Sequence, residues 1–483
     1  MRILFVTSEV TPFSKTGGLA DVSQALPQAL AGRGHQVTVV TPRYRGVDRA
    51  GFILQRIKGR IAVPVHGRNV PGYLFETMID KVRVVFVDQA DYFDRPGLYG
   101  EGGGDYPDNA ERFAFFCRAA LAACATLDFR PQVVHLNDWQ TGPAAVLLQS
   151  QYRDLPQLNA SGTVITIHNL AYAGSFPPQA MLALGLNWDF FTPSGLEFYG
   201  KVSYLKAGLV FADKITTVSR VYAREIQTPA FGCGFEGLLK ERSADVHGIL
   251  NGVDYRNWDP GHDSHIAAAY SAEDFSGKRV CKADLQRTLG LEENPDIPIV
   301  GVVSRLSYQK GFDQMLPLAD RLLGLKAQWA VLGVGEQQVE EGLAEMARRA
   351  PGRFAFRRQL DEVLAHKIQA GSDILLMPSR YEPCGLNQLY ALRYGTIPVV
   401  RAVGGLEETV EDIADNEGYG FKFSGEDPEQ LLKALQRALS AFADKQLWTQ
   451  LMQRAMELDF SWERPARQYE LLYRQVAALR SEK

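Results

Sequence analysis

The sequence predicts an α/β protein built from two Rossmann-like, doubly wound domains that face a central cleft. Short apolar runs typical of buried strands alternate with stretches of helical spacing in both halves of the chain. The alternation stops at residues 251–261, where Asn-Gly and Asp-Pro-Gly are turn sequences, and then starts again. The 483 residues are enough for two to four domains of roughly 100–200 residues, most simply two large ones.

The first half begins with a predicted strand at residues 3–7 and a helix at 20–33, whose apolar side chains recur at helical spacing. A second helix is predicted at 109–127, and the irregular stretch 51–80 is predicted to be rich in β-structure. The other strands predicted here are 35–41, 82–87, 133–136, 163–167 and 214–218. This alternation favours βαβ units and a parallel sheet.

The second half shows the same alternation and predicts a second doubly wound domain. Its predicted strands are 299–304, 329–333, 354–357, 374–378, 398–400 and 420–423. The last segment, 462–481, is predicted to be an amphipathic helix that can pack on either domain.

Composition narrows the class of protein. A formal net charge of −4 gives no general attraction to nucleic acid or to acidic membranes. The apolar run at the N-terminus is too short for a signal peptide, and no stretch approaches the roughly 20 apolar residues of a membrane span. Five scattered cysteines without a C-x-x-C pair indicate a reduced, intracellular protein. For Cys384, a small buried neighbour is favoured over a nucleophile, because no base is placed to activate it.

The segment 379–390 holds the first candidate site. It follows the apolar strand 374–378 and precedes a predicted helix at 389–394, so Glu382 lies at the carboxyl end of a parallel strand, where open α/β sheets bind ligands. The N–H groups of Gly385 and Leu386 are predicted to open the helix and to suit a phosphate. We expect Glu382 to face a sugar; the alternative is that it only caps its helix.

A second loop supplies cations. Arg305 and Lys310 follow the strand 299–304, at the same edge of the predicted sheet. Two cations beside a helix start would form a cage for a pyrophosphate. The alternative is that both side chains are simply solvated.

The first strand is also followed by a Gly-rich turn. Lys15 precedes two glycines, of which Gly18 leads into the helix, so Lys15 can reach a phosphate while Asp21 accepts sugar hydroxyls. The spacing is neither a P-loop nor a dinucleotide fingerprint. A plain tight turn is an equally good explanation of the same residues.

Other polar residues follow strands of the first half. His168 and Asp138 each come directly after a predicted strand, which places them at the cleft edge; a lone histidine in such a position is often structural. The Gly-rich loop 98–107 is predicted to be mobile, with Tyr99 able to stack on a sugar ring, or else to be an ordinary flexible surface loop.

Several signatures are missing from the sequence. Without D-x-D, H-E-x-x-H or a cysteine–histidine cluster, we expect no catalytic metal. Without G-x-S-x-G, a serine hydrolase is disfavoured. The absence of G-x-G-x-x-G speaks against a nicotinamide oxidoreductase, which the Rossmann-like alternation alone would suggest.

Taken in order, these motifs resemble bacterial glycogen synthases and plant starch synthases, glycosyltransferase family 5, along the whole chain. The matching segments are KTGGLAD (15–21), LYG (98–100), DYPDN (105–109), HLNDW (135–139), IHNLAY (167–172), GILNGVD (248–254), SRL (304–306), QKG (309–311), EPCGL (382–386) and VGGL (403–406). Any one of them can arise by chance, whereas the ordered set is specific.

The resemblance implies a GT-B fold and a bacterial, cytoplasmic enzyme. It would transfer glucose from ADP-glucose to the non-reducing-end 4-hydroxyl of an α-1,4-glucan such as glycogen, with retention and without a cofactor. No nucleic acid or membrane partner is implied. The N-terminal domain would be residues 1–253 on the acceptor side, completed by the C-terminal helix 462–483. Residues 254–461 would form the donor domain.

The resemblance also implies roles for single residues. Arg305 and Lys310 would bind the donor diphosphate, with Lys15 and Gly18 completing the phosphate site. Glu382 would contact the donor glucose and stabilise positive charge. His168 would lie beside the reacting glucose, with its backbone carbonyl near the anomeric carbon. Second-rank contacts to donor or acceptor would come from Asp21, Asp138 and Asn251.

Two positions depart from related retaining transferases. Tyr390 stands where relatives have a second glutamate, eight residues after Glu382. Leu360 stands where an aromatic often lines the adenine pocket, which leaves the preference for ADP over UDP open. The alternatives to an ADP-glucose-dependent synthase are therefore an enzyme that uses UDP-glucose, a sucrose-synthase-like enzyme, or an inactive glucan-binding protein. Because no carboxylate pair is present, we favour same-face attack, with the leaving phosphate taking the acceptor proton.

Overall fold

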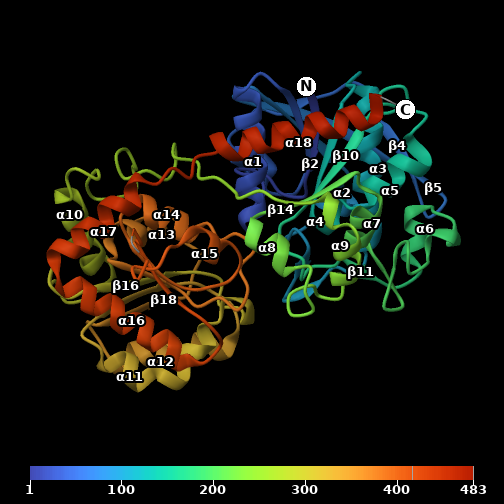
Figure 1. Cartoon of the computed structure of the whole chain (residues 1–483). Coiled ribbons are helices and arrows are strands. Elements are labelled where there is room, and N and C mark those ends of the chain that lie inside the picture. Colours follow the sequence, from blue (N-terminus) through green and yellow to red (C-terminus); the bar gives the residue numbers. More distant parts are fainter. Residues whose placement is uncertain (416, 482–483) are drawn as a thin grey trace. The chain divides into compact units, whose positions relative to one another are not determined.

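The computed structural model describes residues 1–415 and 417–481, which group into two compact units (Figure 1). Unit 1 contains Met1–Val218, Ala223–Gly252 and the C-terminal segment from Trp462. Unit 2 contains Ser219–Tyr222 and Val253–Ser461. Positions 482 and 483 of the predicted segment 462–483 lie outside the described residues. In the part of the chain that is described, no helix is long and apolar enough to cross a membrane.

Unit 1 is built on a ten-stranded sheet with the order β15-β14-β10-β9-β1-β2-β6-β5-β3, and β4 pairs with β5. The strands from β15 to β6 are parallel. They are β1 (Arg2–Val6), β2 (Gln36–Pro42), β6 (Val82–Asp88), β9 (Val133–Asn137), β10 (Gly162–Ile167), β14 (Lys214–Thr217) and β15 (Val246–Gly248). β9 and β10 are buried along their whole length, as expected of strands covered on both faces.

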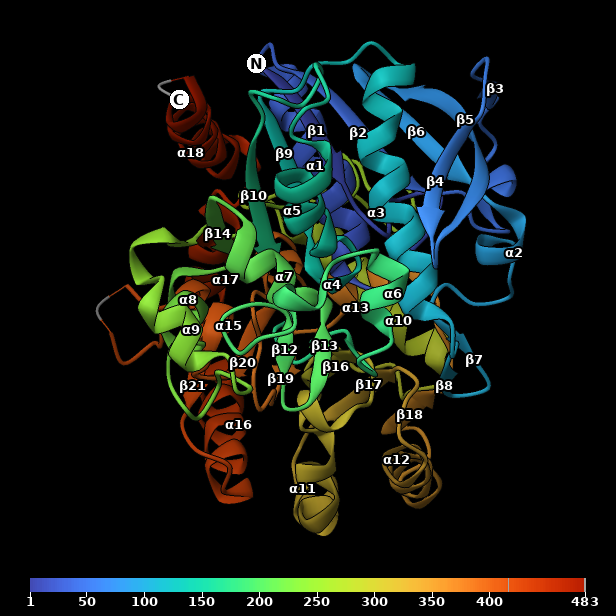
Figure 2. The same ribbon diagram turned by 90° about the vertical axis from the view of Figure 1, so that its right-hand side faces the viewer.

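The predicted β-rich excursion is confirmed. β3 (Gln55–Arg56), β4 (Ile61–Val65) and β5 (Arg68–Ile79) extend the sheet in antiparallel pairing. β4 alternates buried and exposed residues, and it packs on α3 (Asn109–Thr126), beside which it lies in Figure 2. A Cβ at Gly72 of β5 would lie 2.9 Å from the Phe115 ring of α3, so glycine permits this close approach.

The last helix, α18 (Glu463–Ser481), packs on unit 1, a choice that its amphipathic sequence left open. It lies against β9, β10 and α1 (Gly18–Gly32), and is red in Figure 1. The Tyr473 hydroxyl is 2.6 Å from Nδ1 of His135 on β9, and Arg33 after α1 pairs with Glu470 at 2.9 Å. These contacts join the end of the chain to its first domain.

Unit 2 contains a six-stranded, wholly parallel sheet with the order β18-β17-β16-β19-β20-β21. The strands are β16 (Ile299–Val303), β17 (Gln328–Leu332), β18 (Phe354–Arg357), β19 (Ile374–Met377), β20 (Ile397–Arg401) and β21 (Phe421–Phe423). The surrounding helices are α10 (Ser276–Leu289), α11 (Ala319–Gly324), α12 (Gln337–Arg349), α13 (Glu362–Gly371), α14 (Asn387–Arg393), α15 (Gly404–Thr409), α16 (Pro428–Ala443) and α17 (Lys445–Glu457).

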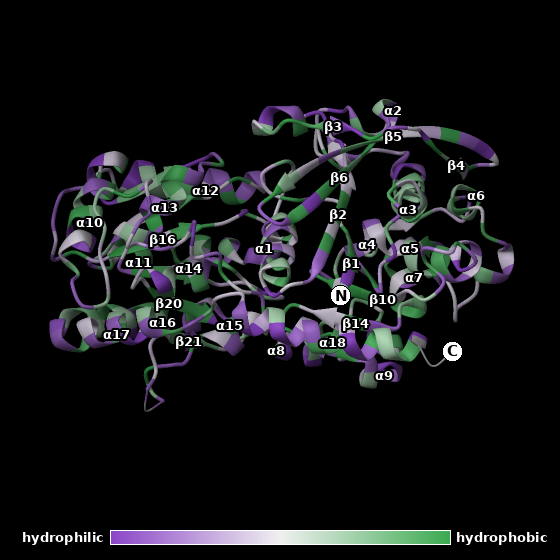
Figure 3. Cartoon of the chain, turned by 90° about the horizontal axis from the view of Figure 1, so that it is seen from above, coloured by the Kyte–Doolittle hydropathy of each residue, from purple (hydrophilic) through white to green (hydrophobic). Residues whose placement is uncertain are grey.

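The helices of unit 2 are amphipathic, and their apolar faces complete its core. α16 buries Leu431, Leu435 and Phe442 among others, while Lys433 and Gln436 are exposed. Figure 3 shows the same mixture as green and purple residues along α16 and α17.

Every strand predicted from an apolar run is present, with ends within about one residue of the prediction. β15, at the sheet edge, escaped prediction because it is three residues long and lacks an apolar run. The loop 98–107 was expected to be without regular structure. Instead, β7 (Gly100–Glu101) and β8 (Gly104–Asp105) form a hairpin whose turn uses positive φ at Gly102 and Gly103.

Candidate active site

Glu382 is a buried carboxylate in the loop between β19 and α14. Its side chain is only 6% exposed. Its Oε2 accepts a hydrogen bond from Nζ of Lys310 at 2.5 Å and another from Oγ of Ser379 at 3.0 Å. Helix α14 instead begins after Leu386, which provides no side-chain cap. The alternative, that Glu382 only caps this helix, is therefore wrong, because its carboxylate is engaged with Lys310.

Lys310 is brought to Glu382 by contact between two loops. It ends the 3-10 turn η5 (Tyr308–Lys310), and Gly311 follows with φ +71°. A Cβ at Gly311 would lie 2.2 Å from the carbonyl oxygen of Pro378, so only glycine allows the loop to pass this close to the end of β19. The N–H of Arg380 also donates to the Gln309 carbonyl at 2.8 Å.

Arg305 follows β16 in the same loop as Lys310, and its side chain is exposed. Among the described residues, no hydrogen-bond or ion-pair partner is found for its guanidinium. The Arg305 guanidinium is therefore available to a ligand. The alternative, that the side chain is simply solvated, fits the same geometry.

The start of α14 presents two backbone donors beside Glu382. Gly385 has φ +71°, and the described chain supplies no acceptor for the N–H groups of Gly385 and Leu386. The neighbouring Gly405 donates its N–H to the Glu382 carbonyl at 2.9 Å. A Cβ at Gly405 would lie 2.0 Å from the carbonyl oxygen of Cys384, and Gly404 has φ +48°, so both positions favour glycine.

In unit 1, Asp138 and His168 lie together, although they follow different strands. Asp138 follows β9 as the first residue of α4 (Asp138–Thr141) and has φ +55°, and its Oδ1 accepts from the His168 N–H at 2.7 Å. Burial raises the pKa of the Asp138 carboxyl to about 7. Burial also lowers the pKa of His168 to about 3, so its ring is neutral and lies 3.0 Å from Oδ1 of Asn137.

The Gly-rich loop carries an internal ion pair. Nζ of Lys15 lies 2.7 Å from Oδ1 of Asp21, and Oγ1 of Thr11 donates to the same oxygen at 3.2 Å. Gly18 is the first residue of α1, as its predicted place at a helix start requires. Lys15 and Asp21, predicted to contact phosphate and sugar separately, are thus partners of each other in this structure.

Tyr99 is held by hydrogen bonds from its phenol. The hydroxyl donates to Oε1 of Glu9 at 2.7 Å and lies 2.8 Å from Oγ of Ser8. Its ring packs near Phe113 and Trp139, with centroids 5.9 and 6.3 Å away. Sequence reasoning missed Glu9; the only available signal was a carboxylate directly after the first strand.

Asn251 lies at the turn before unit 2, and the residue is 5% exposed. Among the described residues, its buried Oδ1 has no hydrogen-bond partner. A buried acceptor without a partner is costly, so a hydroxyl that donated a hydrogen bond to this oxygen would remove that cost.

The two departures from the family pattern have different environments. Tyr390 is buried, and its ring is stacked on Trp258 with centroids 3.9 Å apart. It therefore packs the core of unit 2 rather than replacing a carboxylate. Leu360 is 80% exposed, in the loop after β18.

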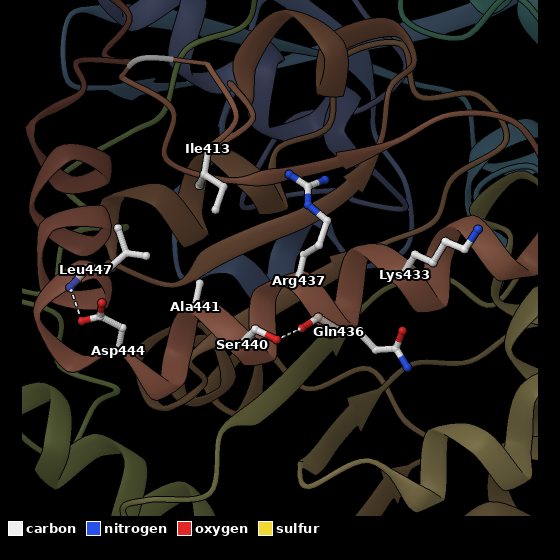
Figure 4. A pocket seen from close by; sticks show the side chains of 8 residues that line it. All are labelled: Ile413, Lys433, Gln436, Arg437, Ser440, Ala441, Asp444 and Leu447. Carbon is white, nitrogen blue, oxygen red and sulfur yellow. Dashed lines mark hydrogen bonds between the residues drawn. The ribbon is translucent and has the colours of Figure 1, made fainter.

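A shallow pocket of about 670 Å³ lies along α16 and α17 (Figure 4). Its lining includes Lys433 and Arg437, and Arg437 is already paired with Asp412. None of the predicted site residues is among the described residues that line it. In the described part of the chain, no cluster of His, Cys, Asp or Glu is arranged to hold a metal ion.

Comparison with known proteins adds to this geometry. Residues 2–241 match the family described as the starch synthase catalytic domain, and residues 290–449 match glycosyl transferases group 1. A protein named glycogen synthase from Anaeromyxobacter sp. (strain Fw109-5) is 52% identical over 480 residues, covering 99% of this chain and 100% of its own. The glycogen synthase of Koribacter versatilis is 48% identical over 487 residues, covering 100% of this chain and 99% of its own.

Two solved structures are similar to this chain. The catalytic domain of starch synthase IV from Arabidopsis thaliana, bound to ADP and acarbose, has a TM-score of 0.92 at 30% identity and covers 99% of both chains. Sucrose-phosphate synthase from Thermosynechococcus elongatus has a TM-score of 0.63 at 19% identity, covering 99% of both chains, and shows likeness of fold alone. The fold is therefore GT-B, with two Rossmann-like domains. From its sequence, its fold and these full-length relatives, the chain belongs to the glycogen synthase and starch synthase family of glycosyltransferases.

Proposed function

We propose that this protein extends an α-1,4-glucan by transferring glucose from ADP-glucose to the 4-hydroxyl at a non-reducing end, with retention of configuration. The glycogen synthase function rests on relatives of that name at about 50% identity over the whole chain. The observation that carries the proposal for the site is the Lys310–Glu382 ion pair, with the exposed Arg305 in the same loop as Lys310.

The cations of unit 2 suit the leaving group. When the donor bond breaks, negative charge grows on the diphosphate, and donors already in place stabilise that charge without reorganisation. We assign this role to Arg305 and Lys310, with the N–H groups of Gly385 and Leu386 as further donors. In unit 1, Lys15 and Gly18 are the proposed phosphate contacts; Lys15 would exchange Asp21 for the phosphate.

Glu382 is proposed to face the donor glucose. Lys310 and Ser379 both donate to Oε2 of Glu382, and neither of these bonds involves the second oxygen, Oε1. A carboxylate there can accept glucose hydroxyls and stabilise positive charge as the anomeric carbon becomes oxocarbenium-like. Lys310 then has two functions, because it binds phosphate and orients the carboxylate.

Retention without a carboxylate pair requires attack on the face that the diphosphate leaves. Retaining hydrolases place two carboxyl groups about 5–5.5 Å apart, and here Tyr390 packs against Trp258 at the position of the second one. In the proposed step, the acceptor oxygen bonds to the anomeric carbon as the phosphate oxygen leaves and takes the acceptor proton. Isolation of a glucosyl group covalently attached to any side chain would refute this route.

The remaining residues of unit 1 are proposed to contact sugars. His168 is neutral, which suits hydrogen bonding to the reacting glucose rather than pairing with phosphate. Asp138, Asp21 and the unpartnered Oδ1 of Asn251 are proposed contacts to hydroxyls. Tyr99 is proposed to contribute one face of its ring, since its hydroxyl is engaged with Glu9.

The deciding experiment measures incorporation of labelled glucose into glycogen from ADP-glucose and from UDP-glucose, together with binding of ADP and UDP. We expect ADP-glucose to be the better donor. Preference for UDP-glucose would correct the donor assignment, and absence of transfer from both would leave a glucan-binding protein. The reduced thiols and the bacterial relatives also support a cytoplasmic location as part of this proposal.

A further inference from the structure

Glu9 is a buried carboxylate that lies next to the Gly-rich loop of unit 1. The residue is 3% exposed and follows β1. Its Oε2 accepts from the N–H of Thr16, and its Oε1 accepts from Oγ1 of Thr16, both at 2.6 Å. The Tyr99 hydroxyl is the third donor, at 2.7 Å from Oε1. Both carboxylate oxygens are therefore engaged by the protein itself.

These bonds join two loops that are far apart in the sequence. Thr16 lies between Lys15 and the glycines that lead into α1. Tyr99 begins the hairpin loop, and its own carbonyl accepts from the Tyr106 N–H at 2.9 Å and from Nδ2 of Asn109 at 2.8 Å. One carboxylate thus fixes the conformation of the Lys15 segment relative to the hairpin.

The backbone of Glu9 is itself anchored. Oγ1 of Thr7 donates to the Glu9 carbonyl at 2.9 Å and lies 2.9 Å from Oγ of Ser23 on α1. Burial, followed by the nearby Glu9 carboxylate, raises the pKa of the Tyr99 phenol well above its usual value, so Tyr99 stays a donor. A buried carboxylate held in this way is a rigid support for a loop.

We infer that Glu9 is a positioning residue for the transfer reaction, and that its carboxylate holds Thr16 so that Lys15 and Gly18 are arranged to receive the diphosphate. This inference rests on the proposed function, which gives Lys15 and Gly18 their ligand. It assigns Glu9 no contact with substrate, because the donors on its two oxygens come from Thr16 and Tyr99.

The first test compares ADP affinity by calorimetry in Glu9→Gln and Thr16→Val. Glutamine keeps the volume of Glu9 but replaces one acceptor oxygen with an NH2 group and removes the negative charge. We therefore expect ADP to bind about tenfold or more weakly. Thr16→Val removes only one of the two Thr16 bonds, and we expect a loss of about threefold to tenfold. Because the substitutions break the same contact, the double variant should bind ADP within about twofold of Glu9→Gln.

The matched control is Glu101→Gln, which makes the same charge change on the exposed strand β7. ADP affinity in this variant should stay within about twofold of the wild type, since an exposed charge contributes little. If Glu9→Gln does not fold, Thr16→Val alone decides. Weak ADP binding in Glu9→Gln together with unchanged binding in Thr16→Val would overturn the inference, because Glu9 would then act by direct contact.

The second test is independent of catalysis. Hydrogen exchange of the Thr16 amide in the ligand-free protein should be faster by about threefold or more in Glu9→Gln, because the neutral amide oxygen of glutamine is a weaker acceptor than a carboxylate, and it should be unchanged in Glu101→Gln. Unchanged exchange in Glu9→Gln would refute the support role. Faster exchange with unaltered ADP affinity would also overturn the inference. Failure of the wild type to add glucose to glycogen would instead refute the proposed function, and the exchange result would still stand.

Discussion

Lys310 and Glu382 form an ion pair in which each partner depends on the other. Their side chains are 16% and 6% exposed, so removing one leaves a buried charge with fewer partners. Such a loss typically costs about 3–5 kcal/mol for a fully buried pair. Both residues were predicted from the sequence as ligand-binding groups, but their direct contact was not.

The first prediction concerns Lys310→Ala. We expect turnover to fall by about 10²–10³, as for loss of one preorganised donor to developing charge, while the glucan KM changes little. Initial rates at varied ADP-glucose and varied glycogen separate the two effects. Lys433→Ala, on the exposed face of α16, is the control and should keep normal turnover. A change confined to the glucan KM would contradict the phosphate role.

The second prediction concerns Asp138, whose pKa is raised to about 7 from an unfolded value near 3.9. The folded state therefore binds this proton more tightly, and the resulting stability is complete below about pH 4 and lost as the pH rises through about 7. Asp138→Asn does not titrate. Its Tm relative to wild type should rise by a few degrees between pH 5 and pH 8, since ~1 kcal/mol corresponds to about 2–4 °C in a domain of this size.

Calorimetric melting at both pH values measures this difference. Asp154→Asn is the control, since Asp154 is exposed in unit 1, and its Tm difference should not vary with pH. A constant Tm difference for Asp138→Asn would mean that the Asp138 carboxyl does not titrate in this range.

At the scale of elements, loop-to-loop contacts hold the site residues of unit 2. The loop after β16 touches the end of β19 through Gly311, and the start of α15 touches the Glu382 loop through Gly405. Each contact requires that no side chain stands between the backbones. Gly311 and Gly405, in the 309–311 and 403–406 motifs, therefore allow the close packing of the loops that carry Lys310 and Glu382.

The third prediction is that Gly405→Ala lowers turnover by about tenfold or more, because its Cβ would lie 2.0 Å from the Cys384 carbonyl and displace the Glu382 loop. The control is Gly324→Ala in α11, where a Cβ meets nothing within 4 Å. Rates and melting curves of both variants give the comparison. Normal activity in Gly405→Ala would show that the loop yields without disturbing Glu382.

At the scale of the whole molecule, ligand binding should appear as stabilisation. ADP at about 100 times its Kd adds about 2.7 kcal/mol to the free energy of unfolding, which is expected to raise the Tm. UDP at the same concentration should raise the Tm less. In Lys310→Ala the ADP shift should largely disappear. An equal shift in Lys310→Ala and wild type would place the nucleotide away from Lys310.

Much of the fold followed from local pattern. The parallel strands were predictable because a strand buried on both faces is continuously apolar, as in residues 374–377. The positions of Glu382, Lys310 and Arg305 were predictable because these residues follow such strands, and the carboxyl ends of parallel strands share one edge. Their roles in binding and catalysis stay predictions. The hairpin at 100–105 was missed because its glycines indicate a turn without indicating what pairs around it.

The sequence by itself determined the fold class, the strands and the family, because burial patterns and motifs consist of residues that are close together in the sequence. Only the tertiary structure decided that Lys15 pairs with Asp21, that Glu382 pairs with Lys310, and that Glu9 joins Thr16 to Tyr99. The physical reason is that a side chain's charge and hydrogen bonds depend on which distant residues the fold brings within about 3 Å.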